Sequence, residues 1–166
     1  MNDGIALAVR ALHRGERNLA GELARAADRH RAEHEIHHVA TDLAVRSREH
    51  VRRIAATAAD REVDLTGPPE AGDASDGVFA PHGTRSSAET ADALDPGLLL
   101  LRDLRELHLS ATANSLHWES LAQLARAAKD PALLSLASAC HPRPLRQMRW
   151  TNTMIKTMSP QVLTSL

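Results

Sequence analysis

The residues best suited to chemistry are gathered in one stretch, His30–His50, with the sequence HRAEHEIHHVATDLAVRSREH. It holds five of the chain's ten histidines, interspersed with carboxylates. Glu35 and His38 are three residues apart, which on a helix places both side chains on one face, as in a pair of metal ligands. With His34 they also match the His-Glu-x-x-His pattern of zinc proteases. The spacing indicates either a metal site or a charged, solvated helix face.

The zinc-protease interpretation lacks the context that this chemistry requires. In such an enzyme two histidines bind zinc, the glutamate activates water and a third ligand follows downstream. Here no strand-forming segments could build a cleft, and no glycine and histidine follow to complete the extended motif. A chance match is expected in a segment this rich in histidine. We therefore do not expect a protease.

Length and composition favour one all-helical domain spanning residues 1–166. The apolar fraction of 43% is mostly alanine and leucine, whereas aromatic residues make up only 2%, which favours helices over strands. A net charge of −1 gives no general attraction to nucleic acids or acidic membranes. Cys140, the single cysteine, excludes an intrachain disulfide and fits a reducing compartment. The N-terminus has no secretory-signal pattern, and the longest aliphatic run, Leu98–Leu101, is too short to span a bilayer. We expect a cytoplasmic protein with neither nucleic-acid nor membrane partners.

Apolar residues recur with a helical period in four segments, which predicts helices over about 4–28, 32–62, 97–129 and 131–158. A turn near residues 29–31 should separate the first two, and one continuous helix is the alternative. Asp130 and Pro131 match an N-cap followed by proline at the first helical position. Pro142 and Pro144 predict a break near Cys140, and Pro160 is expected to end the last helix.

Residues 64–96, between the second and third helices, predict an acidic crossover loop that is partly disordered. The segment contains four glycines, four prolines and seven acidic residues against one arginine. When extended, such a loop could span roughly 110 Å, whereas a helix of about 30 residues is only about 45 Å long. The loop can therefore return along the whole molecule and start the third helix at the opposite end.

Two antiparallel helical hairpins joined by a long crossover loop resemble the ferritin-like four-helix bundles. The segments that carry the resemblance are HEIHHVATDLAVRSREHVRRIA, LLLLRDLRELHLSATANSLHWESLAQLARAAKD and LRQMRWTNTMIK. Their overall pattern is similar to small actinobacterial-type ferritin-like proteins of unassigned function. Di-iron members of the superfamily place one glutamate on each of two helices and a Glu-x-x-His pair on each of the other two.

The resemblance implies a partial set of metal ligands. On the first three helices the candidates are Glu16, Glu22, Glu35, His38 and His108, with Glu106 as an alternative to His108. The fourth helix fails, because residues 145–158 contain no acid and no histidine. Arg146 and Arg149 add positive charge there, which opposes a dication. The site is thus expected to be degenerate or absent, with no cofactor or a single iron, manganese or zinc ion.

Several polar residues fall on the predicted buried stripes. Ser47, His50 and His108 are expected to form hydrogen bonds within a polar layer of the core, with Glu16 or Asn152 as partners. Trp118 and Trp150 are expected to anchor the core because of their size.

Three functions are consistent with these features. The first is a non-catalytic binding or scaffold protein that forms a homo-oligomer or binds a protein partner. The second is a ferritin-like oxidoreductase or metal-storage protein that uses Glu35 and His38. The third is a regulatory module in which the acidic loop masks the basic residues of the fourth helix, Arg143, Arg146, Arg149 and Lys156.

Overall fold

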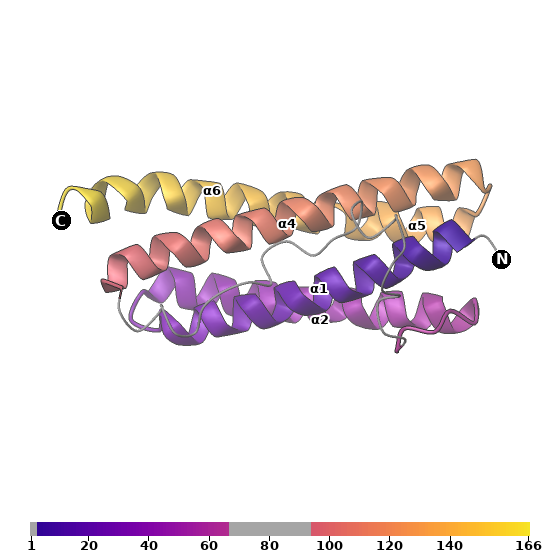
Figure 1. The fold of residues 1–166 in the computed structure, drawn as a ribbon, viewed down its shortest axis with the longest axis horizontal. Helices are drawn as coiled ribbons and strands as arrows, with labels where there is room; N and C mark the ends of the chain where they lie inside the picture. Colours follow the sequence, from indigo (N-terminus) through magenta and orange to yellow (C-terminus); the bar gives the residue numbers. More distant parts are fainter. Residues whose placement is uncertain (1–2, 67–93) are drawn as a thin grey trace.

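The computed structural model describes residues 3–66 and 94–166, and every regular element within these ranges is an α-helix. The elements are α1 (Asp3–Arg29), α2 (His34–Asp60), α4 (Pro96–Ala127), α5 (Pro131–Cys140) and α6 (Pro142–Leu163). The long helices lie side by side along the long axis of the molecule, and α5 with α6 takes the place of a fourth helix (Figure 1). The all-helical prediction is confirmed, and the arrangement is compatible with a four-helix bundle.

A short turn at residues 30–33 separates α1 from α2, so the alternative of one continuous helix is wrong. The turn contains no glycine or proline, which is why the sequence marks it weakly. Its geometry is fixed by hydrogen bonds instead. The Nδ1–H of His37 donates to the carbonyl of Ala27 at 2.7 Å, which satisfies one of the carbonyls that a helix end leaves without a partner. The Glu33 amide donates to the carbonyl of His30 at 3.0 Å.

The predicted start of α5 at Asp130 and Pro131 is confirmed, and α4 begins with a cap of the same kind. The Asp95 carboxylate accepts from the Gly97 amide at the start of α4, and the Asp130 carboxylate accepts from the Leu133 amide at the start of α5. Both helices begin with proline, whose missing N–H is not needed in the first turn. The helix also breaks between Cys140 and Pro142, as predicted.

Two boundaries differ from the prediction. Pro160 does not end the last helix, which continues to Leu163. A proline so close to the end forfeits only one intrahelical hydrogen bond, and the Thr164 amide still donates to the Pro160 carbonyl at 3.2 Å. The predicted loop at 64–96 is non-helical at 64–66 and 94–95, while Pro96 already belongs to α4. Residues 67–93 lie outside the described residues.

Ion pairs show which helix ends meet. Asp103 near the start of α4 contacts Arg29 at 2.6 Å and His30 at 2.8 Å, at the turn between α1 and α2. Arg61, just after α2, contacts Asp130 between α4 and α5 at 2.7 Å. The start of α4 therefore lies at the same end of the molecule as the end of α1, and the ends of α2 and α4 lie together at the opposite end (Figure 1).

Replacing Asp103 by alanine is expected to lower the free energy of unfolding by about 2 kcal/mol, because hydrogen bonds to charged groups contribute more than neutral ones. Asp103 is only 9% exposed. Burial by itself raises the pKa of its carboxyl, but hydrogen bonds from His30 and Arg29 and the Arg29 charge outweigh this and lower it. Urea unfolding followed by circular dichroism measures the change. Asp42→Ala is the matched control, since its contact with Arg46 is exposed and 3.8 Å long, and it should cost less than about 0.5 kcal/mol. Equal effects of the two variants would contradict a stabilising role for Asp103.

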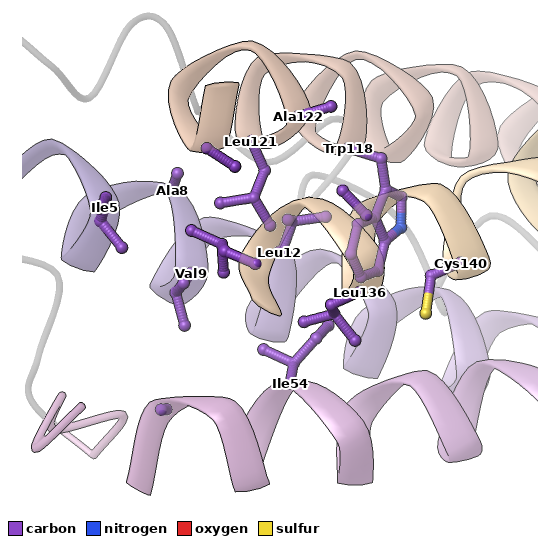
Figure 2. Close-up of a cluster of buried hydrophobic side chains, with 14 of the residues drawn as sticks. Ile5, Ala8, Val9, Leu12, Ile54, Trp118, Leu121, Ala122, Leu136 and Cys140 are labelled. Atoms are coloured by element: carbon purple, nitrogen blue, oxygen red, sulfur yellow. The ribbon is translucent and has the colours of Figure 1, made fainter. Parts of the chain in front are cut away.

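The apolar core consists of separate clusters. The largest includes Ile5, Leu12, Ile54, Trp118 and Leu136, contributed by α1, α2, α4 and α5 (Figure 2). A second cluster is built around leucines of α1, α2 and α4, namely Leu19, Leu23, Leu43 and Leu107. A third comprises Ile36, Leu100, Leu104 and Met154.

Two glycines of α1 should respond in opposite ways to alanine. A Cβ atom on Gly15 would overlap Oδ1 of the buried Asn114, so Gly15→Ala is expected to destabilise the protein by about 1–2 kcal/mol. A Cβ atom on Gly21 would meet only the flexible end of Arg25, at 3.2 Å. Gly21→Ala should therefore stabilise by about 0.5–1 kcal/mol through helix propensity. Thermal unfolding of both variants tests the prediction, and stabilisation by both would show that α1 and α4 are not in close contact at Gly15.

Candidate functional site

A layer of buried polar side chains lies between the two larger apolar clusters. We call it the mid-bundle polar layer, and its members are Glu16, Ser47, His50, Asn114, Gln147 and Thr151, each at most 4% exposed. On α1 the clusters hold residues 5–12 on one side of Glu16 and 19–27 on the other. The same alternation recurs on α2 around Ser47 and His50 and on α4 around Asn114. Buried polar groups at equivalent heights on different helices are placed to form hydrogen bonds with one another.

Glu16 is the centre of this layer and is 0% exposed. Its Oε1 atom accepts a hydrogen bond from Nε1 of Trp118 at 2.8 Å. The same oxygen lies 3.3 Å from Nδ1 of His50, so the two side chains form an ion pair when the imidazole is protonated. The rings of His50 and Trp118 pack edge to face, with centroids 5.8 Å apart. The predicted pairing of His50 with Glu16 is confirmed, whereas Asn152 is exposed and was wrongly proposed as a partner.

The environment of His50 favours its charged form. Burial by itself lowers the pKa of His50, but hydrogen bonding to Cys140 and Glu16 and the negative charge of Glu16 outweigh it and raise the pKa to about 9. At neutral pH the imidazole of His50 is therefore protonated. Cys140 is itself fully buried.

The α6 side of the layer is made of uncharged groups. The amide Nε2 of Gln147 donates to Oγ of Ser47 at 3.1 Å, linking α6 to α2. The Thr151 hydroxyl donates to the Gln147 carbonyl at 3.0 Å and lies 2.9 Å from Nδ1 of His108. Because this hydroxyl proton is already engaged, His108 donates to it. His108 is half-buried rather than fully buried, and its partner is on α6.

The structure places the five predicted metal ligands in different environments. Glu16 lies in the mid-bundle polar layer, Glu22 is half-buried further along α1, and His108 is bonded to Thr151. Glu35 and His38 are exposed on α2, as expected of a solvated helix face. Within residues 3–66 and 94–166, no three or more His, Cys, Asp or Glu side chains lie together in a way that could hold a metal ion. The set is therefore not assembled into one site.

The mid-bundle polar layer does not fit the two-metal centre of ferritin-like proteins. That centre needs four carboxylates and two neutral imidazoles, whereas the layer contains one carboxylate and one imidazole. The Oε2 atom of Glu16 has no hydrogen-bond partner among the described residues, but Oε1 accepts from Trp118. An imidazolium at position 50 has no lone pair on its ring nitrogens for a metal. The side chains of the layer therefore bond to one another, and they do not provide the ligands for a two-metal reaction.

Sequence reasoning missed the hydrogen bond from Trp118 to Glu16 and the ion pairs of Asp103. The hydrogen bond of Trp118 could have been predicted, since a buried indole N–H needs an acceptor. Glu16 is a carboxylate in line with the apolar residues Leu12 and Leu19 of the first helix. Trp118 is 0% exposed, which confirms it as a core anchor, while Trp150 is only partly buried. For Asp103 no pattern distinguishes a buried acid from the exposed acids around it.

No described helix combines the length and the apolar character needed to cross a membrane. Comparison of the chain with protein-family models, with curated proteins and with solved structures gave no match.

Proposed function

We propose that this chain is a four-helix bundle of ferritin-like topology that acts as a binding or scaffold protein rather than as a metal enzyme. In this topology α1 and α2 form one antiparallel hairpin, α4 with α5 and α6 forms the other, and a crossover segment connects them. The contacts of Asp103 with Arg29 and His30, and of Arg61 with Asp130, support it. They place the end of α2 and the start of α4 at opposite ends of the molecule (Figure 1).

The observation that carries the proposal is the engagement of Glu16. Its carboxylate lies in the core, and the resemblance implied it as a metal ligand, yet it is bonded to Trp118 and paired with His50. From the fourth helix, α6 contributes Gln147 and Thr151 at this height. These contacts favour a stabilising role for the layer, which leaves the outer helix faces as the functional surfaces.

The outer faces carry groups suited to protein contacts. Val45, Leu116 and Leu145 are large apolar residues that are 50%, 63% and 44% exposed. Large apolar side chains on an outer face can supply the apolar contacts at the core of a protein interface. A homo-oligomer or a complex with a protein partner is therefore the proposed working state.

Metal analysis tests the proposal. Protein without a histidine tag, produced in medium supplemented with iron and manganese and purified without chelators, should contain well below one equivalent of iron plus manganese per chain. Adding iron or manganese back to the chelator-treated protein should not raise its melting temperature, since only ligands that bind the folded state stabilise it. Two equivalents per chain, lost together with several degrees of melting temperature on chelation, would contradict the proposal.

A regulatory module is the second candidate, favoured by the charge of α6. This helix has no acidic residue, and Arg146, Arg149 and Lys156 are exposed. The crossover segment is acidic in sequence and could compete with an acidic partner for these residues.

Neutralising the acids of the crossover tests this module without shortening the connection. The substitutions replace the carboxylates by amides at Glu70, Asp73, Asp76, Glu89 and Asp92. Affinity for a poly-glutamate peptide at low salt should then rise by tenfold or more. An unchanged affinity would contradict masking by the crossover segment.

A further inference from the structure

Two exposed histidines converge at the start of α2. His34 is its first residue and His38 lies one turn later. Their Nε2 atoms are 3.1 Å apart, and their ring centroids are 4.2 Å apart with an angle of 61° between the planes. Without a metal, one ring donates its Nε2–H to the other. The Nε2 atoms thus face a common point at the surface.

This separation matches the spacing of two ligands on one metal ion. Bonds from imidazole nitrogen to zinc are about 2.0–2.1 Å long. Two such bonds at angles between square-planar and tetrahedral values place the nitrogens about 2.9–3.4 Å apart. The observed 3.1 Å falls within this range. The two nitrogens therefore already have a separation that one metal ion can bridge.

We propose that His34 and His38 chelate one divalent transition-metal ion, of the class zinc, copper or nickel, with water completing its coordination. Imidazole suits these ions, whereas magnesium and calcium prefer oxygen ligands. The site is on the surface of α2, away from Glu16 and His50, and so goes beyond the proposed function of the bundle. The sequence predicted that His38 acts with Glu35, but the contact of His38 in the structure is with His34.

The electrostatics of the site combine one unfavourable and one favourable contribution. A helix N-terminus carries partial positive charge, which opposes a cation. Glu33 and Glu35 flank His34 in the sequence, are exposed, and supply negative charge. The first turn of α2 is also held in place, because His37 donates to the Ala27 carbonyl at the end of α1. The two histidines therefore lie on a helical turn that is fixed against α1, and the neighbouring glutamates supply negative charge that favours a cation.

Calorimetric titration of the tag-free, chelator-treated protein with zinc chloride and with copper chloride tests the site. The wild type should bind one equivalent of either ion, and magnesium chloride should give no heat of binding. His34→Gln and His38→Gln should each weaken binding at least tenfold and should fold normally, because both side chains are exposed. Acidification should also weaken binding, since imidazole must lose its proton to act as a ligand.

Glu35→Gln is the matched control and should change the affinity less than threefold. No binding by the wild type, or binding by both histidine variants as tight as that of the wild type, would overturn the proposal, since the ion would then sit elsewhere or not at all. A loss in Glu35→Gln as large as in His38→Gln would also overturn it, in favour of the Glu35–His38 pair. None of these outcomes bears on the bundle's proposed function, which depends on iron and manganese being absent from the mid-bundle polar layer.

Discussion

Replacing Glu16 by alanine is expected to lower the free energy of unfolding by about 3–5 kcal/mol, the largest effect of any single substitution proposed for this chain. The change removes the acceptor of the Trp118 indole and the counter-charge of His50. Both partners are almost fully buried, so water cannot replace the lost contacts without opening the core. Guanidinium unfolding, followed by circular dichroism and Trp fluorescence at pH 7, measures the loss.

Two controls separate charge pairing from general loss of side-chain volume. Glu49→Ala removes an exposed glutamate paired with Arg52 on the same helix, and should leave the free energy of unfolding almost unchanged. The double variant Glu16→Met with His50→Met removes both charges and should recover at least half of the loss seen in Glu16→Ala, because no unpaired charge remains. A cost below 1 kcal/mol for Glu16→Ala would show that the carboxylate does not hold the layer together.

Alkaline pH is expected to destabilise the wild-type protein by up to about 3 kcal/mol between pH 6.5 and 9.5. The pKa of His50 is raised from 6.5 to about 9 in the folded protein. A raised pKa means that the folded state binds the proton more tightly than the unfolded state. The stabilisation is therefore fully present below pH 6.5 and is lost as the pH rises through about 9.

Urea unfolding at four pH values across this window measures the effect. His50→Gln should show a much flatter dependence, since its side chain does not titrate. Cys140→Ala should show a smaller decline than the wild type, because hydrogen bonding to Cys140 contributes to the raised pKa. A wild-type curve as flat as that of His50→Gln would mean that His50 is neutral in the folded protein.

The helices could be predicted from the sequence because their information is local. The spacing of apolar residues defined the four helical segments, and Asp130 with Pro131 marked a start that the structure confirms. The burial of Ser47, His50 and Trp118 followed from the same periodicity. Pro160 was misjudged because the cost of a proline depends on how near the helix end lies, and that end is not marked in the sequence.

The candidate site was harder to predict because its partners lie on different helices. Glu35 and His38 have the spacing of ligands, yet they fall on the exposed face of α2. Glu16 stands in no motif, yet it meets Trp118 at a sequence separation of 102 residues. Such contacts depend on how each helix is rotated about its axis and shifted along it relative to its neighbours. The 3.6-residue period of the apolar residues defines the rotation of a helix only to within a fraction of a turn. The contact between His34 and His38 could have been predicted from the sequence, because residues four apart on a helix are neighbours on its surface.

Nuclear magnetic resonance titration of the His50 imidazole most directly tests whether the side chains of the mid-bundle polar layer hold one another through an ion pair. Protein labelled with carbon-13 and nitrogen-15 is titrated from pH 5 to 10, and His50→Gln assigns the resonance. A pKa near 9, falling in Glu16→Gln, is the predicted result. A pKa at or below 6.5, unchanged in Glu16→Gln, would contradict it.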